Sequence, residues 1–209
     1  MMESSAIGAE LFLLGDLMAD ILQATKAYKK LLDVEYQIVL GKKGKNLSLH
    51  IFFDKIQFFH LAGLQYLEDI PDIFRSKRDV LFNKILNGNI THKQIESSEF
   101  YPEIKDRIGY LVYLEDIMDS NETVFKYNPK LESFSAFQAD FLLKNEIQTR
   151  NIFTFLSEDK SSGKYFCRSF FPQTDKDYSL GQTNWKLLYK KKIHKSTRTE
   201  TVLCDRMRG

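Results

Sequence analysis

Apolar residues recur with a period near 3.6 in the first part of the chain, as on one face of a helix. This spacing predicts a long amphipathic helix from about Ser5 to Asp33. Two runs with strand-like alternation follow, Tyr36–Leu40 and Leu47–Phe53, and they flank a glycine-containing turn. The pattern predicts a β-hairpin directly after the first helix.

The middle of the chain returns to helical spacing. Asp54 occupies an N-cap position, and apolar residues follow it in helical phase until Pro71, where we expect the helix to end. Capping residues and apolar faces predict three further helices, at Ser76–Leu86, Thr91–Ser97 and Pro102–Asp119.

The pattern changes after Asn128-Pro129 to short runs rich in Phe, Tyr and Ile, separated by polar and glycine-rich segments. The predicted strands are Phe141–Leu143, Asn151–Leu156, Lys164–Phe171 and Trp185–Ile193, with Glu200–Asp205 as an added edge strand. The predicted fold class is α+β: N-terminal helices with a small β-hairpin, then a C-terminal four- to five-stranded antiparallel sheet. We divide the chain into an N-terminal helix, 1–35, and an α+β domain, 36–209, which together form a single compact unit.

Composition supports a folded protein and leaves its partner open. Of the 209 residues, 43% are hydrophobic and 13% aromatic, enough for a core. Thirty basic residues nearly balance 28 acidic ones. The two cysteines are isolated, which excludes a disulfide scaffold and a thiolate zinc site. Asp16 and Asp20 interrupt the most apolar stretch, so we expect no membrane span and a cytoplasmic protein.

Several classes of enzyme are disfavoured because their motifs are missing. The four histidines show no metal-ligand spacing, and the chain lacks a phosphate-binding loop, GxGxxG and GxSxG. Zinc hydrolases, nucleotide kinases, dehydrogenases and serine esterases are therefore disfavoured, and we expect no metal and no cofactor.

His60 lies in an otherwise apolar helical segment, next to Ala62-Gly63. A core histidine bonded to a carbonyl is the simpler interpretation of this segment alone. The alternative is a general acid or base, because the imidazole pKa lies near neutrality. A glycine inside a helix lowers stability by about 1 kcal/mol, so Gly63 indicates close packing.

Arg168 lies in the middle of a predicted strand, among aromatic residues. Its guanidinium could hold a phosphate through two hydrogen bonds, or pair with a carboxylate such as Asp140. In a regular strand Arg168 and Ser169 face opposite sides, so both can serve one site only if a β-bulge intervenes. Tyr165 shares a face with Ser169.

A basic run lies near the C-terminus, from Tyr189 to Arg198. One interpretation is a solvated edge strand, in which lysines discourage aggregation. The other is a basic ridge for nucleic-acid phosphates, with Tyr189, Trp185 and Tyr178 available for base stacking.

Five segments between about Tyr36 and Thr197 carry a resemblance to a known family: Phe59-His60-Leu61-Ala62-Gly63-Leu64, Ser98-Glu99-Phe100, Thr123-Val124-Phe125-Lys126-Tyr127-Asn128, Tyr165-Phe166-Cys167-Arg168-Ser169-Phe170-Phe171-Pro172 and Lys195-Ser196-Thr197. The chain resembles the phage-borne members of the barnase–EndoU–colicin–RelE-like nuclease superfamily, most closely the fourth phage-borne subfamily. The resemblance implies a helical part followed by a four-stranded antiparallel sheet, and metal-independent endonuclease chemistry, usually on RNA. Members occur on phages and mobile elements, often inside larger proteins.

The leading hypothesis is therefore an endoribonuclease that uses the RNA 2′-hydroxyl as nucleophile and leaves a 2′,3′-cyclic phosphate. His60 would be the base or acid and Arg168 the phosphate clamp, while Lys195, with Ser196 or Ser169, would complete the cradle. The RNA-binding candidates are Tyr165, Tyr189, Lys190, Lys192 and Trp185. Candidate substrates are tRNA and mRNA.

The alternative is a catalytically inactive protein of the same fold that binds a host protein, an immunity partner or RNA. Surplus aromatic residues would form its contact surface, and the N-terminal helix would pair in a homodimer. A DNA-binding regulator fits less well, because no predicted helix carries a basic stripe.

Overall fold

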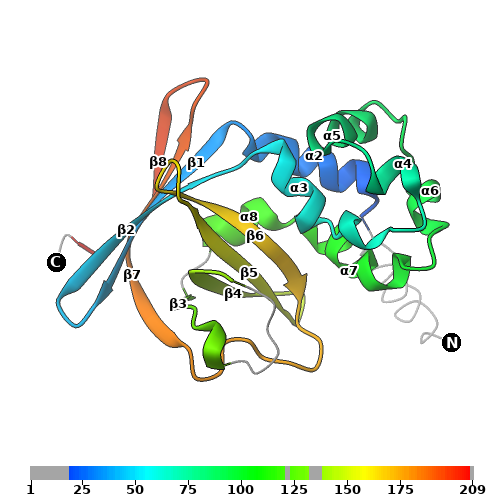
Figure 1. Ribbon diagram of the computed structural model, residues 1–209. Coiled ribbons are helices and arrows are strands. Elements are labelled where there is room, and N and C mark those ends of the chain that lie inside the picture. The colour runs from blue at the N-terminus through cyan, green and yellow to red at the C-terminus, as the bar shows by residue number, and fades with distance from the viewer. Residues whose placement is uncertain (1–18, 121–122, 132–137, 208–209) are drawn as a thin grey trace, which may run out of the picture.

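A closed barrel forms one half of the molecule (Figure 1). The computed structural model describes residues 19–120, 123–131 and 138–207. The strands follow the order β1-β2-β6-β5-β4-β3-β7-β8, and an additional β1–β7 pairing closes the first seven into the barrel. The strands are β1 (Val34–Lys42), β2 (Lys45–Phe52), β3 (Thr123–Lys126), β4 (Phe141–Ile147), β5 (Arg150–Asp159), β6 (Lys164–Pro172), β7 (Thr183–His194) and β8 (Thr199–Asp205).

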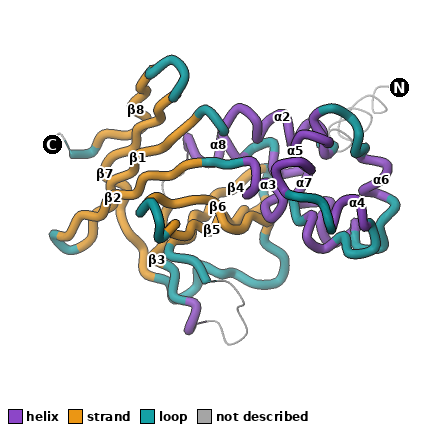
Figure 2. The backbone as a smooth tube through the Cα atoms, turned by 45° about the horizontal axis from the view of Figure 1, so that its top comes forward, coloured by secondary structure: helices purple, strands orange, loops and turns teal. Residues whose placement is uncertain are grey.

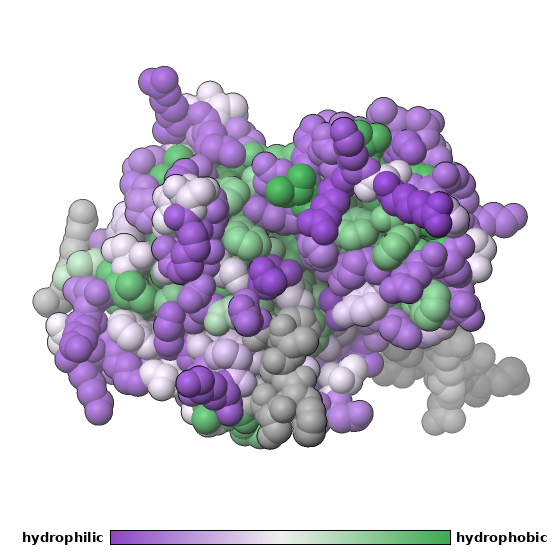
Figure 3. Space-filling model, viewed as in Figure 1, coloured by the Kyte–Doolittle hydropathy of each residue, from purple (hydrophilic) through white to green (hydrophobic). Residues whose placement is uncertain are grey.

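The helices gather at one side of the barrel (Figure 2). Most of them are formed by the long connection between β2 and β3. The α-helices are α2 (Ile21–Leu31), α3 (Lys55–Leu61), α4 (Pro71–Phe74), α5 (Arg78–Leu86), α6 (His92–Glu96), α7 (Tyr101–Leu111) and α8 (Leu114–Ser120); the 3₁₀ turns are η1 (Leu64–Tyr66) and η2 (Pro129–Leu131). Buried residues of the helices and of the barrel form one large core, and Tyr127, Leu142, Phe153 and Phe155 form a second, smaller cluster. On the face shown in Figure 3, apolar side chains gather where the helices meet the barrel.

The prediction of N-terminal helices with a separate hairpin, followed by a four- to five-stranded antiparallel sheet, is wrong. The predicted hairpin exists as β1 and β2, but both strands belong to the barrel. β2 lies parallel to β6, with Ile51 opposite Tyr165 and Phe52 opposite Phe166. β1 pairs with β7 along most of its length. These pairings join strands far apart in sequence, so the local alternation that predicts each strand does not reveal them.

β3 was not predicted, since the strand-like texture was expected only after Asn128-Pro129. This strand has only four residues, and it fills the gap between β4 and β7. Without it the barrel would not close. The resemblance had already singled out the segment from Thr123, although not as a strand.

The predicted N-terminal helix is described only from residue 19 onward, and its part from Ser5 to residue 18 lies outside the described residues. Within the described part, α2 begins after Asp20, which forms a capping box with Gln23. The apolar face of α2, including Ile21 and Tyr28, is buried in the common core. That face is therefore not available for the homodimer expected of this helix.

Asp54 caps α3 as predicted, but the helix is shorter than expected. Gly63 ends it in the left-handed conformation, with φ of 78°. A Cβ atom at Gly63 would lie 2.7 Å from Ile104 Cγ2 and 3.1 Å from Arg107 Cδ, both in α7. The close packing expected at Gly63 is present, between the end of α3 and α7. Pro71 was expected to end this helix, but it lies at the start of α4.

α8 is fixed against the barrel by two buried lysines of β7. The Lys190 side chain is 1% exposed, and its Nζ donates to the carbonyl oxygens of Met118 (2.8 Å) and Asp119 (3.3 Å) at the C-terminal end of α8. Lys192 Nζ contacts the carboxylates of Glu115 (2.7 Å) and Asp119 (2.8 Å). Burial opposes the charge of Lys192, but these two acceptors outweigh it and raise the pKa of the ammonium group.

Across the residues that the structure describes, no helix is long and apolar enough to cross a membrane.

We expect Gly63→Ala to lower the free energy of unfolding more than Gly88→Ala does, by at least about 1 kcal/mol. Both glycines have positive φ, so both substitutions strain the backbone, but a Cβ at Gly88 meets nothing within 4 Å. Urea unfolding of the two variants and the wild type measures the difference. Equal losses would show that the contact with α7 does not constrain Gly63.

Candidate active site

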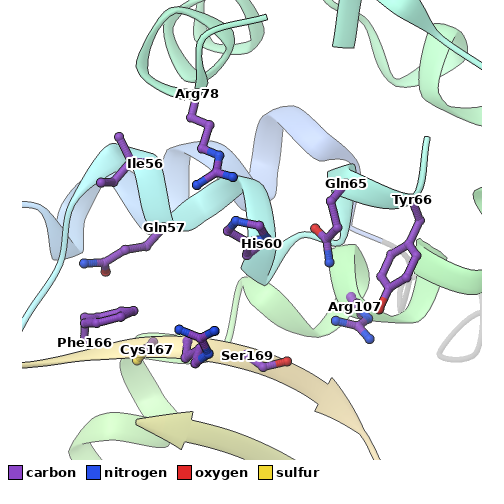
Figure 4. Close-up of a pocket in the computed structure, with 11 residues that line it drawn as sticks. Ile56, Gln57, His60, Gln65, Tyr66, Arg78, Arg107, Phe166, Cys167 and Ser169 are labelled. Carbon is purple, nitrogen blue, oxygen red and sulfur yellow. The ribbon is translucent and has the colours of Figure 1, made fainter. Parts of the chain in front are cut away.

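A cavity of about 420 Å³ lies between the helices and β6 (Figure 4). Four elements of the helical region form one wall, and β6 forms the other. The lining residues are Ile56, Gln57 and His60 of α3, Gln65 and Tyr66 of η1, Arg78 of α5, Arg107 of α7 and Phe166, Cys167, Arg168 and Ser169 of β6. The structure thus brings His60, Arg168 and Ser169 to one cavity.

A β-bulge in β6 explains how neighbouring residues of one strand line the same cavity. Ser169 lies opposite Phe155 of β5, whereas Cys167 lies opposite the next residue, Leu156. Arg168 is thus the extra residue between these two pairs, and it has no partner in the register. The sequence required such a bulge if Arg168 and Ser169 were to share a site, and it is present.

His60 is half-buried in the cavity, where Arg78 and Gln65 approach its ring (Figure 4). Burial lowers the pKa of the imidazole, and the positive charges of Arg78 and Arg168 lower it further. The Gln65 side chain acts in the opposite direction by favouring the protonated ring. His60 is therefore mainly neutral at pH 7 in the ligand-free protein and can accept a proton.

Arg78, Arg107 and Arg168 bring three positive charges to this cavity. Among the described residues, none of the three guanidinium groups has a carboxylate within ion-pair distance. Arg78 instead lies over the Phe59 ring, with its Cζ 5.3 Å from the ring centroid. Positive charges without acidic partners, gathered at one cavity, suit an anionic ligand.

Arg107 lies beneath Tyr66, at the end of the cavity away from His60 (Figure 4). Its Cζ lies 5.3 Å from the ring centroid of Tyr66 and 5.1 Å from that of Phe171. Burial lowers the pKa of the guanidinium, while its interactions with Tyr66 act against this shift. Arginine remains charged at pH 7 under such conditions, so Arg107 adds a fixed cation.

Cys167 and Gln65 also line the cavity, and neither acts as a nucleophile. Complete burial raises the pKa of the Cys167 thiol to about 12, so the thiol stays protonated at neutral pH. Gln65 has a buried side-chain oxygen for which the described residues provide no hydrogen-bond partner. A donor from a bound ligand or a water molecule would satisfy that oxygen.

Asp140, the alternative partner of Arg168 in the sequence analysis, binds other groups instead. Asp140 lies 3.7 Å from Lys126 and accepts a hydrogen bond of 2.9 Å from the backbone N–H of Glu158. The sequence left two roles for Arg168, and the structure gives no support to the pairing with Asp140.

Lys195 and Ser196 do not line the cavity. They lie in the turn between β7 and β8, where Asp33 binds them. The Asp33 carbonyl accepts from the Lys195 backbone N–H at 2.8 Å, and its carboxylate accepts from the Ser196 backbone N–H at 2.9 Å and from the Ser196 hydroxyl at 2.5 Å. Arg78 and Arg107, and not Lys195 and Ser196, complete the polar lining of the cavity.

The other RNA-binding candidates also lie outside the cavity. Lys190 and Lys192 point into the protein and bind α8, so they do not form a solvent-facing ridge. Tyr189 and Trp185 are half-buried in β7, and the Tyr165 ring packs edge-on against Phe141 at 5.6 Å.

The sequence analysis missed Arg78, Arg107 and Gln65. Arg78 opens a helix and Arg107 lies within one, and both positions are ordinary for a surface arginine. Gly63 was the available signal, because the close packing expected there is with Ile104 and Arg107 of α7.

The described residues contain no group of three His, Cys, Asp or Glu side chains that could hold a metal ion. The site that the structure does define is a cationic cavity with a neutral histidine, which suits a phosphate-containing ligand.

The family comparison agrees with a site for phosphate. The model of the family described as phage-Barnase-EndoU-ColicinE5/D-RelE like nuclease 4 matches residues 20–206, and the chain belongs to this family. The resemblance seen in the sequence is confirmed. The protein is thus a phage-type nuclease of the barnase/EndoU superfamily, for which nucleic acids are the expected substrates. Neither the curated proteins nor the solved structures contain a significant match.

We expect His60 to make the protein less stable as the pH falls below about 6.5, the ordinary histidine pKa. Because the folded state lowers the pKa of His60, the unfolded chain binds a proton in a pH range where the folded protein does not. The free energy of unfolding should therefore fall with pH more steeply in the wild type than in His60→Gln. Urea unfolding between pH 5 and pH 8 tests this, with His50→Gln, at an exposed position of β2, as the control. Parallel curves for the wild type and His60→Gln would contradict the lowered pKa.

Proposed function

We propose that the protein is a metal-independent endoribonuclease with His60 as the general base and Arg78 and Arg168 as the phosphate-binding groups. The observation that carries the proposal is the junction of a histidine of lowered pKa with arginines that have no acidic partner, in one cavity. Family membership supports nuclease chemistry. We choose RNA as the substrate because its 2′-hydroxyl can serve as the nucleophile.

The reaction begins when neutral His60 accepts the proton of the 2′-hydroxyl next to the scissile phosphate. The 2′-oxygen then forms a bond to phosphorus, and negative charge builds on the phosphoryl oxygens. Arg78 and Arg168 stabilise this charge, since their guanidinium groups are already in place before the substrate binds. The bond from phosphorus to the 5′-oxygen breaks, and the 5′-oxygen takes a proton from water. The hydroxide left behind takes the proton from His60, which restores the neutral base. The products are a 2′,3′-cyclic phosphate and a 5′-hydroxyl end.

The bound phosphate also changes the charge around His60. In the empty cavity two arginines oppose protonation of the ring. A phosphate between them offsets their charge, so protonated His60 is better tolerated after it has accepted the proton. The same cations thus keep the base neutral before binding and bind the substrate that it deprotonates.

We include Ser169 and Arg107 in the site as substrate-binding groups and leave Lys195 and Ser196 outside it. Ser169 lines the cavity next to the bulge, and its hydroxyl can donate to a phosphate oxygen. The Ser196 hydroxyl already donates to Asp33. Candidate substrates remain tRNA and mRNA.

We expect the purified protein to cleave RNA in the presence of EDTA. His60→Gln should lower kcat/KM by about 10²–10⁴-fold because it removes the base. Arg168→Gln should lower it by about 10²–10³-fold because it removes charge stabilisation in the transition state. Gel analysis of a labelled RNA, with cyclic-phosphate ends identified by mass spectrometry, measures both effects.

Two matched variants serve as controls for this experiment. His50→Gln and Arg75→Gln change exposed residues of the same types outside the cavity and should retain full activity. Wild-type activity in both His60→Gln and Arg168→Gln would reject the proposed site. Binding of RNA without turnover by the wild type would instead favour the catalytically inactive alternative.

The pH dependence of kcat/KM distinguishes a base from an acid. A base must be neutral, so we expect activity to fall on the acidic side, with a midpoint below the ordinary histidine pKa of about 6.5. Arg78→Gln removes a positive charge near the ring, so it should raise the pKa of His60 and move the midpoint to higher pH. Arg75→Gln should leave the midpoint in place. Loss of activity on the alkaline side, with a shift of that limb in Arg78→Gln, would assign His60 as the acid.

A further inference from the structure

A second cavity, of about 330 Å³, lies on the other side of Arg107. It is formed by the first turns of α7, the end of β6 and the loop from β6 to β7. Its lining residues are Pro102, Glu103, Asp106 and Arg107, and on the other side Phe171, Pro172, Thr174 and Tyr178. Its volume is at the lower end of the range of about 300–1,000 Å³ found for small-ligand sites.

Arg107 is the wall that the two cavities share, since it lines both of them. Its guanidinium is held between the rings of Tyr66, in the first cavity, and Phe171, in the second. A ligand with a phosphate in the first cavity can therefore extend into the second cavity, because only the Arg107 side chain separates the two. In a nucleic acid strand, the group next to the phosphate is a nucleoside.

The second cavity has an aromatic wall whose position is fixed. The rings of Phe171 and Tyr178 lie 5.5 Å apart in an edge-to-face arrangement, and the Tyr178 ring also packs against Phe153 at 5.6 Å. Asp177, next to Tyr178, forms an ion pair of 2.8 Å with Lys144 of β4. The loop therefore presents Tyr178 from a rigid anchor, and aromatic rings in such a position suit the planar faces of nucleobases.

Apart from Arg107, whose guanidinium only donates, the polar groups of the second cavity are mainly hydrogen-bond acceptors. Glu103 is exposed at the start of α7, and Asp106 is held by Arg150 at 2.8 Å. Thr174 adds a hydroxyl. Carboxylates accept hydrogen bonds from exocyclic amino groups, and they repel the two carbonyl oxygens that flank the ring N–H of uracil. The wall thus favours a base with an exocyclic amino group.

We propose that this second cavity binds the nucleobase next to the scissile phosphate and prefers adenine, cytosine or guanine to uracil. The aromatic wall supplies stacking, Glu103 supplies the preference, and Arg107 separates the base from the phosphate. The proposal rests on the proposed function, because it takes the first cavity as the site of the phosphate.

The test uses short single strands that contain one ribonucleotide, and therefore one cleavable phosphate, among 2′-deoxynucleotides. The strands differ only in the base next to that phosphate. We expect the wild type to prefer an amino-bearing base to uracil by about tenfold in kcat/KM. Tyr178→Leu should raise KM about tenfold with little change in kcat, because stacking acts equally on the substrate and the transition state. Glu103→Gln should reduce the preference over uracil, since an amide both donates and accepts. Glu99→Gln, which changes an exposed carboxylate outside the cavity, is the matched control.

A parallel binding experiment separates this proposal from the proposed function. Fully 2′-deoxy strands of the same sequences cannot react, and fluorescence anisotropy measures their affinity. If the wild type cleaves RNA without base preference, and both variants behave like Glu99→Gln, the second cavity is not a base site although the nuclease function stands. If RNA is not cleaved but the deoxy strands bind with the expected preference, and Tyr178→Leu weakens that binding, the base site stands and the catalytic proposal fails. Absence of both cleavage and binding overturns both. Glu103→Gln keeps the test valid should Tyr178→Leu fail to fold, because Glu103 is exposed.

Discussion

The β-bulge at Arg168 is the constraint on which the cavity depends. In a regular strand, residues 167–169 would alternate between the core and the outer face, and the cavity would receive either Arg168 or its neighbours. The extra residue breaks the register with β5 between Phe155 and Leu156, so Arg168 lines the same cavity as its buried neighbours Cys167 and Ser169. The helices then need only to bring His60 to the opposite wall, and α3 does so because it follows β2 directly, beside β6.

The buried lysines of β7 and the arginines of the cavity have different environments and different roles. Lys192 lies between two carboxylates, and Lys190 binds carbonyls at the end of α8. Their charge is satisfied within the fold, so it serves to attach α8 to the barrel. Arg78 and Arg107 of the cavity have aromatic rings beside them, and among the described residues no acid pairs with either of them or with Arg168. This is why we propose the cavity, and not the lysine-rich strand, as the phosphate site.

The sequence predicted individual elements well and their assembly poorly. Caps such as Asp54 and Thr91 act through residues within one turn, so the starts of α3 and α6 follow from local chemistry. The strand at Trp185–Ile193 followed from its aromatic and aliphatic residues, but these do not show that β1 lies beside it, and so the barrel was missed. For the same reason both interpretations of the basic run, an edge strand and a basic ridge, place its lysines in solvent, and only the closed barrel shows that Lys190 and Lys192 point inward. His60 and Arg168 were recognisable because their neighbours are unusually apolar, whereas Arg78 and Arg107 carry no such local mark.

The closure of the barrel has a consequence for when the site comes into existence during synthesis. His60 leaves the ribosome more than a hundred residues before Arg168, and β1, at the start of the barrel, has to wait for β7. Proteins dominated by contacts between distant segments fold late, after most of the chain is available. A nascent chain therefore carries the histidine without the opposing arginine, and the cationic cavity is assembled only after β6 and β7 have been synthesised. For a protein of a nuclease family, the topology itself delays the competent state until most of this domain has left the ribosome.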